Sequence, residues 1–141
     1  MNRKVLLVDE WRAVRLLGRR VLSTLGFQAR EARSGLEALE VFALEPDISA
    51  VLLEWKPQDD DCLNLVKRFA TIPRHARPAI VACGIALDRS QIVAARAAGA
   101  DEFLHKPYGL EALREKFEQL GVTVGSSPNS DEILSSGHSR K

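Results

Sequence analysis

The sequence has few cysteines, little net charge and no long apolar run, and each shortage excludes a class of protein. Two cysteines, Cys62 and Cys83, are too few for a disulfide framework and lack CxxC spacing. A net charge of +1 excludes the bulk basic field of a nonspecific nucleic-acid binder. No apolar run reaches membrane-spanning length, and no signal peptide precedes the first predicted strand. We therefore expect a cytoplasmic protein with reduced thiols and no membrane contact.

What is present is typical of one ordinary globular domain. The 141 residues are enough for a proper hydrophobic core. The hydrophobic content of 45% and charged content of 28% are those of a soluble protein.

Short apolar runs alternate along the chain with longer stretches of helical spacing. The predicted strands are residues 5–8, 27–31, 48–54, 79–83 and 101–105. Five such strand–helix units predict an α/β fold, a doubly wound parallel sheet with right-handed crossovers and helices on both faces.

Two helix starts carry a capping-box pattern, in which an N-cap side chain precedes Glu or Gln by three residues. They are Ser34 with Glu37, and Asp88 with Gln91. The helix after Ser34 is predicted to bury Leu36, Leu39 and Phe42. The first helix shows apolar residues at helical spacing, which are Trp11, Val14, Leu17, Val21 and Leu25.

The composition changes at Val122. Residues 126–130 and 135–137 are rich in Ser, Gly and Asn and almost without core-forming side chains. We predict a domain over residues 1–121 and a flexible tail over 122–141. Ile133 and Leu134 leave open a short docking element within that tail.

Acidic residues end two of the apolar runs. Glu54 follows the third run, and Asp9 and Glu10 follow the first. Because an open parallel sheet places its ligand site at the carboxyl ends of its strands, these three acids favour a cation site there.

A set of residues at the predicted strand ends resembles a known family. The motifs are Val8-Asp9-Glu10, Glu54, Cys83, Lys106-Pro107 with Phe103 three residues before the lysine, and Ala98-Gly99-Ala100-Asp101. Over about residues 4–120 the chain resembles the receiver domain of two-component response regulators, of the chemotaxis-regulator type. The resemblance implies the flavodoxin-like (βα)5 receiver fold with strand order 2-1-3-4-5.

The resemblance also implies roles for these positions. Glu54 stands at the phosphoacceptor position, and Asp9 and Glu10 at the positions that hold Mg²⁺ together with the backbone carbonyl of Lys56. Cys83, Phe103 and Lys106 stand where the family reads out the phosphoryl group. A cis bond before Pro107 is implied as well.

Two of these positions depart from the family pattern, which carries Asp and a hydroxyl residue there. The Glu54 carboxylate stands about 1.5 Å further out than an Asp carboxylate, and an error of about 1 Å is costly for a reaction that depends on alignment. A thiol at Cys83 is a weak donor in place of a hydroxyl. Lys56 is placed to substitute in part for the cation, so we expect Mg²⁺ binding to be weak or lost.

These departures predict an atypical single-domain response regulator, not an enzyme, that acts by protein–protein contact largely independently of phosphorylation. The family resemblance implies that its partner, a sensor kinase or downstream target, binds the fourth helix, fifth strand and fifth helix. Exposed candidates on that face are Arg89, Arg96, Glu102, Tyr108 and Arg114. A homodimer is left open.

Two alternatives remain. One is a phosphorylatable stand-alone receiver in a phosphorelay, using Glu54 despite its length. The other is an effector that binds a cyclic dinucleotide through the basic first helix, since arginine binds phosphate bidentately. The basic residues are Arg12, Arg15, Arg19 and Arg20, with Arg30 and Arg33 nearby. Direct DNA binding is not expected, because no helix-turn-helix is appended.

Overall fold

The computed structural model describes residues 3–56, 58–85 and 87–122. The strands are β1 (Lys4–Val8), β2 (Gln28–Ala32), β3 (Ile48–Glu54), β4 (Ala79–Gly84) and β5 (Glu102–His105). The helices are α1 (Arg12–Thr24), α2 (Gly35–Leu44), α3 (Asp60–Ala70), α4 (Arg89–Ala98) and α5 (Leu110–Gln119), with a short 3-10 helix η1 (Arg74–Ala76) that the sequence pattern did not predict.

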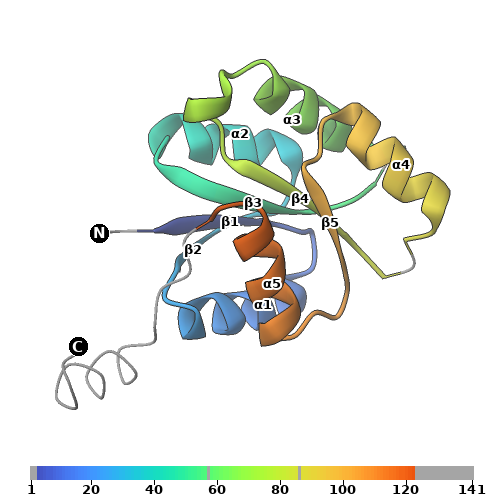
Figure 1. Cartoon of the computed structure of the whole chain (residues 1–141). Helices are drawn as coiled ribbons and strands as arrows, with labels where there is room; N and C mark the ends of the chain where they lie inside the picture. Colours follow the sequence, from blue (N-terminus) through green and yellow to red (C-terminus); the bar gives the residue numbers. More distant parts are fainter. Residues whose placement is uncertain (1–2, 57, 86, 123–141) are drawn as a thin grey trace, which may run out of the picture.

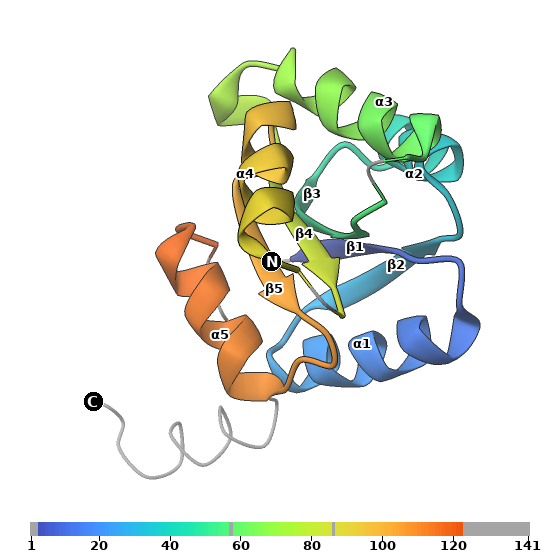
Figure 2. The same cartoon turned by 90° about the vertical axis from the view of Figure 1, so that its right-hand side faces the viewer.

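The five strands form one parallel sheet in the order β2-β1-β3-β4-β5 (Figures 1 and 2). This order confirms the predicted doubly wound α/β fold. β1 and β3 lie in the middle of the sheet, so their carboxyl ends meet at its centre.

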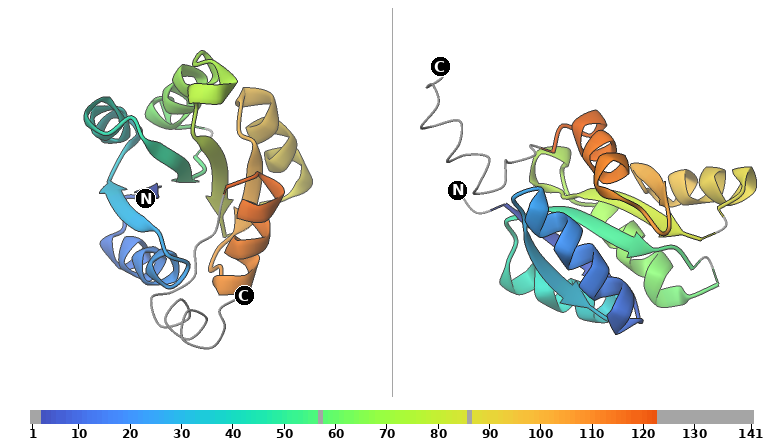
Figure 3. Two further views of the ribbon diagram at one scale, coloured as in Figure 1. Left: turned by 60° about the vertical axis from the view of Figure 1, so that its left-hand side comes forward. Right: turned by 90° about the horizontal axis from the view of Figure 1, so that it is seen from below.

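Helices cover both faces of the sheet. In Figure 1, α2, α3 and α4 lie above the sheet, and α1 and α5 lie below it; the view from below in Figure 3 shows α1 and α5 in front of the strands. Because successive strand side chains point to opposite faces, β1 supplies both cores. Leu6 and Val8 belong to the core under α2, α3 and α4. Val5 and Leu7 belong to the core with Phe117 of α5.

The predicted helix starts are largely as the capping patterns indicate. Asp88 and Gln91 form a complete capping box at α4. At α2 the Ser34 side chain accepts the Glu37 N–H, as predicted, but the Glu37 carboxylate accepts the Arg33 N–H instead of that of Ser34. The reciprocal bond of a capping box is therefore shifted by one residue at α2: Glu37 accepts from the N–H of Arg33, the residue before the N-cap.

The predicted buried face of α2 is partly wrong. Its buried residues are Gly35 and Ala38, whereas Leu36 is 60% exposed and Leu39 and Phe42 are partly buried. The reason is a close approach between α2 and α3: a Cβ on Gly35 would lie 2.3 Å from the backbone oxygen of Asp61. Small residues must therefore face inward at this end of α2.

The apolar series of the first helix is only partly its buried face. Leu25 is fully buried and Val21 packs against the core, whereas Trp11 and Leu17 are 62% and 60% exposed. The buried residues within α1 are Arg15, Gly18 and Leu22. The space between α1 and the residues it packs on is short here, since a Cβ on Gly18 would meet the Tyr108 hydroxyl at 2.8 Å.

The end of the described chain packs on the domain. Val122, the first residue of the predicted tail, donates its N–H to the Phe117 carbonyl at 2.8 Å and packs against the core shared by α1 and α5. The rest of the predicted tail, including Ile133 and Leu134, lies outside the described residues. Among the helices described here, none is long and apolar enough to cross a membrane.

Candidate functional site

The carboxyl ends of four strands bring the predicted site residues together. Asp9 follows β1, Glu54 ends β3, Cys83 lies beside Glu54 on β4, and Lys106 follows β5. Backbone hydrogen bonds hold this edge: Trp55 donates to the Cys83 carbonyl at 2.8 Å. The sheet thus places acids, a thiol and a lysine around one small cleft.

Lys106 is the buried cation of the site. Its Nζ lies 2.8 Å from Asp9 Oδ2 and 3.6 Å from Glu54 Oε2. The side chains of Lys106 and Asp9 are only 9% and 7% exposed, so this pair is shielded from solvent. The peptide bond from Lys106 to Pro107 is cis, the form that the resemblance implied.

Lys56 is a second cation at the same site. Its Nζ lies 3.6 Å from Glu54 Oε1 and also forms an ion pair with the Glu10 carboxylate. The hydrogen bond to Glu10 and the charge of Glu54 raise the pKa of Lys56 above its ordinary value, against a smaller opposing effect of desolvation. Lys56 is therefore a permanent ammonium at neutral pH.

The two lysines pair with the same carboxylates that a magnesium ion would need as ligands. Each oxygen of Glu54 faces one ammonium, and Asp9 and Glu10 each pair with one of the same two groups. The two clefts that touch Glu54 have volumes of about 20 and 30 Å³, room for about one water. Within the described residues, no three His, Cys, Asp or Glu side chains are grouped to hold a metal.

This arrangement does not fit a hydrated magnesium ion. Mg²⁺ requires near-octahedral oxygen coordination and usually keeps several waters. Three carboxylates that face two ammonium groups retain one net negative charge, which is little attraction for a divalent cation.

Cys83 is a buried thiol beside Glu54. Its side chain is 3% exposed, and burial raises its pKa to about 12, against a lowering influence of Lys106. Its hydrogen bond runs to the Val81 carbonyl on its own strand, at 3.7 Å. Cys83 therefore stays protonated at neutral pH and directs its weak donor away from the acids.

Cys62 shapes the loop that carries Lys56, a role that the sequence pattern did not indicate. Its Sγ accepts the Lys56 N–H at 3.4 Å and lies 3.6 Å from the Glu54 carbonyl. Asp59 caps α3 just before it by accepting the Asp61 N–H at 2.9 Å. The acidic turn is thus a helix N-terminus, where carboxylates are favoured.

Arg15 has a second role that sequence reasoning missed. It is 8% exposed, donates from Nη1 to the Asp9 carbonyl at 2.7 Å and pairs through Nε with Glu31 at 2.8 Å. Arg15, Gly18 and Leu22 stand at helical spacing and form the buried face of α1. The sequence signal for this role of Arg15 was its position on that face.

The basic surface predicted on α1 is largely paired within the molecule. Arg15 and Arg19 share the Glu31 carboxylate, and Arg30 pairs with Glu45 at 2.8 Å. Arg33 pairs with Glu37 at 3.6 Å, so four of the six arginines considered for a cyclic dinucleotide are already engaged with carboxylates.

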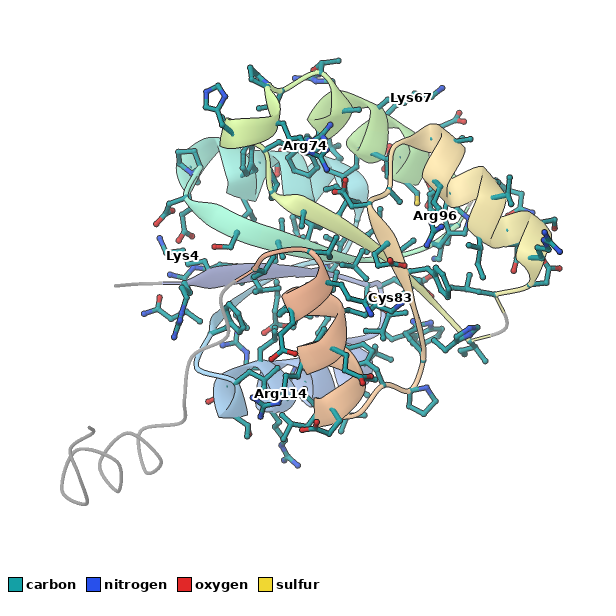
Figure 4. All side chains as sticks on the ribbon, viewed as in Figure 1. Lys4, Lys67, Arg74, Cys83, Arg96 and Arg114 are labelled. Atoms are coloured by element: carbon teal, nitrogen blue, oxygen red, sulfur yellow. The ribbon has the colours of Figure 1, made fainter. Side chains whose placement is uncertain are left out.

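Phe103 lies between two cations on the α4, β5 and α5 face. The Arg96 guanidinium lies 5.4 Å, and the Lys116 ammonium 4.5 Å, from the centre of its ring. Glu102 binds both cations, at 3.0 and 3.3 Å. Arg96 is labelled on α4 in Figure 4. Glu102 was predicted to be exposed but its side chain is only 16% exposed, because these two partners cover it.

Tyr108 was also predicted to be exposed on that face, and this is wrong. Its ring points toward α1, where its hydroxyl approaches Gly18, and it lines the cleft with Lys106. Burial raises its pKa above the ordinary value of a tyrosine. The remaining candidates, Arg89, Arg96 and Arg114, are on the surface, although Arg114 pairs with Glu111 at 3.2 Å.

The parallel sheet order and the charged cleft at its carboxyl edge define a receiver-type signalling domain. The family model described as "Response regulator receiver domain" matches residues 5–118. The chain belongs to the response regulator receiver domains of two-component signalling.

Relatives from several bacteria agree with this membership. The chain is 28% identical to chemotaxis protein CheY1 of Helicobacter pylori over 125 residues, which are 88% of this chain and 98% of the relative. It is 32% identical to sporulation initiation phosphotransferase F of Bacillus subtilis over 116 residues, which are 82% of this chain and 90% of the relative.

Solved structures show the same fold. A putative response regulator from Chloroflexus aurantiacus matches with a TM-score of 0.74 and 26% identity, covering 85% of this chain and 98% of that one. Chemotaxis protein CheY4 of Vibrio cholerae matches in fold with a TM-score of 0.74 at 20% identity, covering 84% of this chain and 98% of that one.

Proposed function

We propose that this receiver works in the cytoplasm by binding a partner protein, a sensor kinase or a downstream target, largely without phosphorylation or Mg²⁺. One observation carries the proposal: each carboxylate oxygen of Glu54 lies 3.6 Å from a lysine ammonium, Lys56 on one side and Lys106 on the other. The acceptor position is therefore held as an ion-paired carboxylate.

Three features of the site support the loss of phosphotransfer. A carboxylate between two ammonium groups is a weaker nucleophile, and it stands one methylene too far out. The lysine pairs replace the metal that would bring in a phosphodonor and balance its charge. Cys83 offers no hydroxyl to a phosphoryl oxygen, since its thiol is directed to the Val81 carbonyl.

The proposed partner surface is the α4, β5 and α5 face. There Phe103 is flanked by Arg96 and Lys116, and Arg89 adds an exposed cation. Because Glu102 binds Arg96 and Lys116 in the resting molecule, an acidic partner would compete with it for both cations. This supports a partner whose contact surface is acidic.

The test is incubation of the chain with a small phosphodonor, acetyl phosphate, and Mg²⁺, followed by intact-mass measurement. We expect no labile phosphoryl group. A phosphoryl group mapped to Glu54 would establish the alternative, a phosphorylatable stand-alone receiver. The matched control is Glu54→Gln, which cannot form an acyl phosphate and calibrates nonspecific modification.

A further inference from the structure

We propose that a cavity at the amino-terminal edge of the sheet binds a small phosphomonoester of sugar-phosphate size. The cavity has a volume of about 460 Å³. Ala79 at the start of β4 lines it, whereas Cys83 near the end of β4 lines the cleft beside Glu54. Cys83 lies four residues after Ala79 along β4, roughly 13 Å at the rise of a β-strand, so this site is independent of the function proposed above.

The cavity carries an excess of positive charge. Arg3, Arg74 and Arg77 line it, against one carboxylate, that of Asp101. Asp101 is already engaged in the fold, because its Oδ2 accepts the Ile80 N–H at 2.8 Å and its Oδ1 lies 4.0 Å from Arg74. The arginine charge that Asp101 does not balance is sufficient to attract a dianion.

Arg3 is held at the wall of the cavity by its contact with Phe27. Its guanidinium lies over the Phe27 ring, 5.6 Å from the ring centre. Its Nε is shielded from solvent and has no hydrogen-bond partner among the described residues, so a ligand in the cavity does not reach that atom in this arrangement. The part of Arg3 that lines the cavity, together with Arg74 and Arg77, would supply the donors to an anion.

The loop that carries the other two arginines is constrained on both sides. Pro73 precedes η1, and Pro78 follows Arg77. Arg77 has φ −101° and ψ 134°, the extended conformation that a following proline favours. Its hydrogen bond to the Ala70 carbonyl is long, at 3.5 Å, so the other donors of its guanidinium can be offered to a ligand.

The shape and lining of the cavity limit the class of ligand. The planar guanidinium matches two oxygens of a phosphate, and Arg74, with its side chain 83% exposed, is placed at the mouth. The other walls include Pro78, Leu120 and Val122, and the volume is in the range of small-molecule sites. No aromatic side chain lines the cavity within the described part of the chain, so it lacks a stacking surface for a nucleobase.

The experiment is a titration of the ¹⁵N-labelled full chain with inorganic phosphate, ribose 5-phosphate and ribose, followed by backbone amide shifts. We expect saturable shifts at Ser49, Ala79 and Gly121 with both phosphates and none with ribose. Ribose 5-phosphate should bind more tightly than phosphate, because its sugar contacts the apolar walls.

Variants locate the contacts. Arg3→Gln should raise the Kd for ribose 5-phosphate at least tenfold. Arg77→Gln should raise it by a similar factor. Because Arg77→Gln leaves the contact between Arg3 and Phe27 intact, it tests the site even if Arg3→Gln misfolds. Arg20→Gln, an exposed arginine of α1, is the matched control of equal charge change and should leave Kd unchanged.

Three outcomes would overturn the proposal. Shifts centred on Glu54 and Lys106 would mean that phosphate binds the lysines of the acidic cleft. An equal loss of affinity in Arg20→Gln would mean a diffuse electrostatic effect. The absence of any saturable shift at tens of millimolar phosphate would mean that the cavity is not an anion site.

Discussion

Replacement of Lys56 by methionine should allow the acidic cleft to bind Mg²⁺. The substitution keeps the length of the side chain but removes the ammonium that lies 3.6 Å from Glu54 and pairs with Glu10. Two carboxylates then lose a competing cation, while Lys106 still pairs with Asp9.

The size of the effect follows from Coulomb's law. Two unit charges 3.6 Å apart attract by about 1 kcal/mol in water and by about 5 kcal/mol at an effective dielectric constant of about 20. Because Lys56 and Glu54 are 35% and 20% exposed, we take the screened end, about 1–2 kcal/mol. This corresponds to a roughly five- to thirtyfold gain in Mg²⁺ affinity from the contact with Glu54 alone, and the release of Glu10 adds to it.

The assay is a Mg²⁺ titration by calorimetry, with tryptophan fluorescence as a second reading because buried Trp55 adjoins Glu54. The control is Lys67→Met, an exposed lysine of α3 (Figure 4), which should behave as the parent chain. Equal Mg²⁺ affinity in the parent chain and in Lys56→Met would refute the competition of lysine and metal. So would the same gain in Lys67→Met, since it would show a general charge effect.

Three further predictions concern the thiols, the pH dependence and the core. Cys83 and Cys62 are buried with raised pKa values, so Ellman's reagent at pH 8 should react at least a hundredfold more slowly with the folded chain than in denaturant; comparable rates would contradict their burial. Desolvation raises the pKa of Glu31, but the hydrogen bonds from Arg15 and Arg19 outweigh it and hold this pKa below its ordinary value. Its folded pKa is below its unfolded one, so its stabilisation is present above the unfolded value and is lost as pH falls through the folded value. In urea unfolding at pH 7 and about pH 3, the difference between the parent chain and Glu31→Gln should shrink at the lower pH, and a constant difference would count against this pairing. Phe117→Ala removes a fully buried ring and should lower the free energy of unfolding by about 3–5 kcal/mol, whereas a loss below about 1 kcal/mol would mean that α5 packs differently.

The fold was predictable because its signals are local and repeated. Apolar runs of strand length and the helical spacing between them require only neighbouring residues to be read, and β3 (Ile48–Glu54) was predicted to the residue. The residues gathered at the carboxyl edge were also predictable, since the ends of parallel strands must meet there.

What could not be predicted depends on contacts between distant elements. The Leu36 prediction failed because the buried face of α2 is set by the approach of Gly35 to Asp61 of α3, which no spacing within α2 records. Tyr108 was assigned to the surface because the loop after β5 gives no sign that its ring turns back toward Gly18. Arg15 was considered only as a surface arginine for a cyclic dinucleotide, because its acceptors, Asp9 and Glu31, come from outside α1.

The contacts of Lys56 have a consequence for any engineered change of the acceptor position. Its backbone N–H is held by the Cys62 thiol, and its ammonium pairs with Glu10 and Glu54. Under the function proposed above, Glu54→Asp alone would not give a working acceptor, because Lys56 would still pair with Glu10 and the Cys83 thiol would still be directed to the Val81 carbonyl. On that proposal, phosphotransfer would require changes at Glu54, Lys56 and Cys83 together.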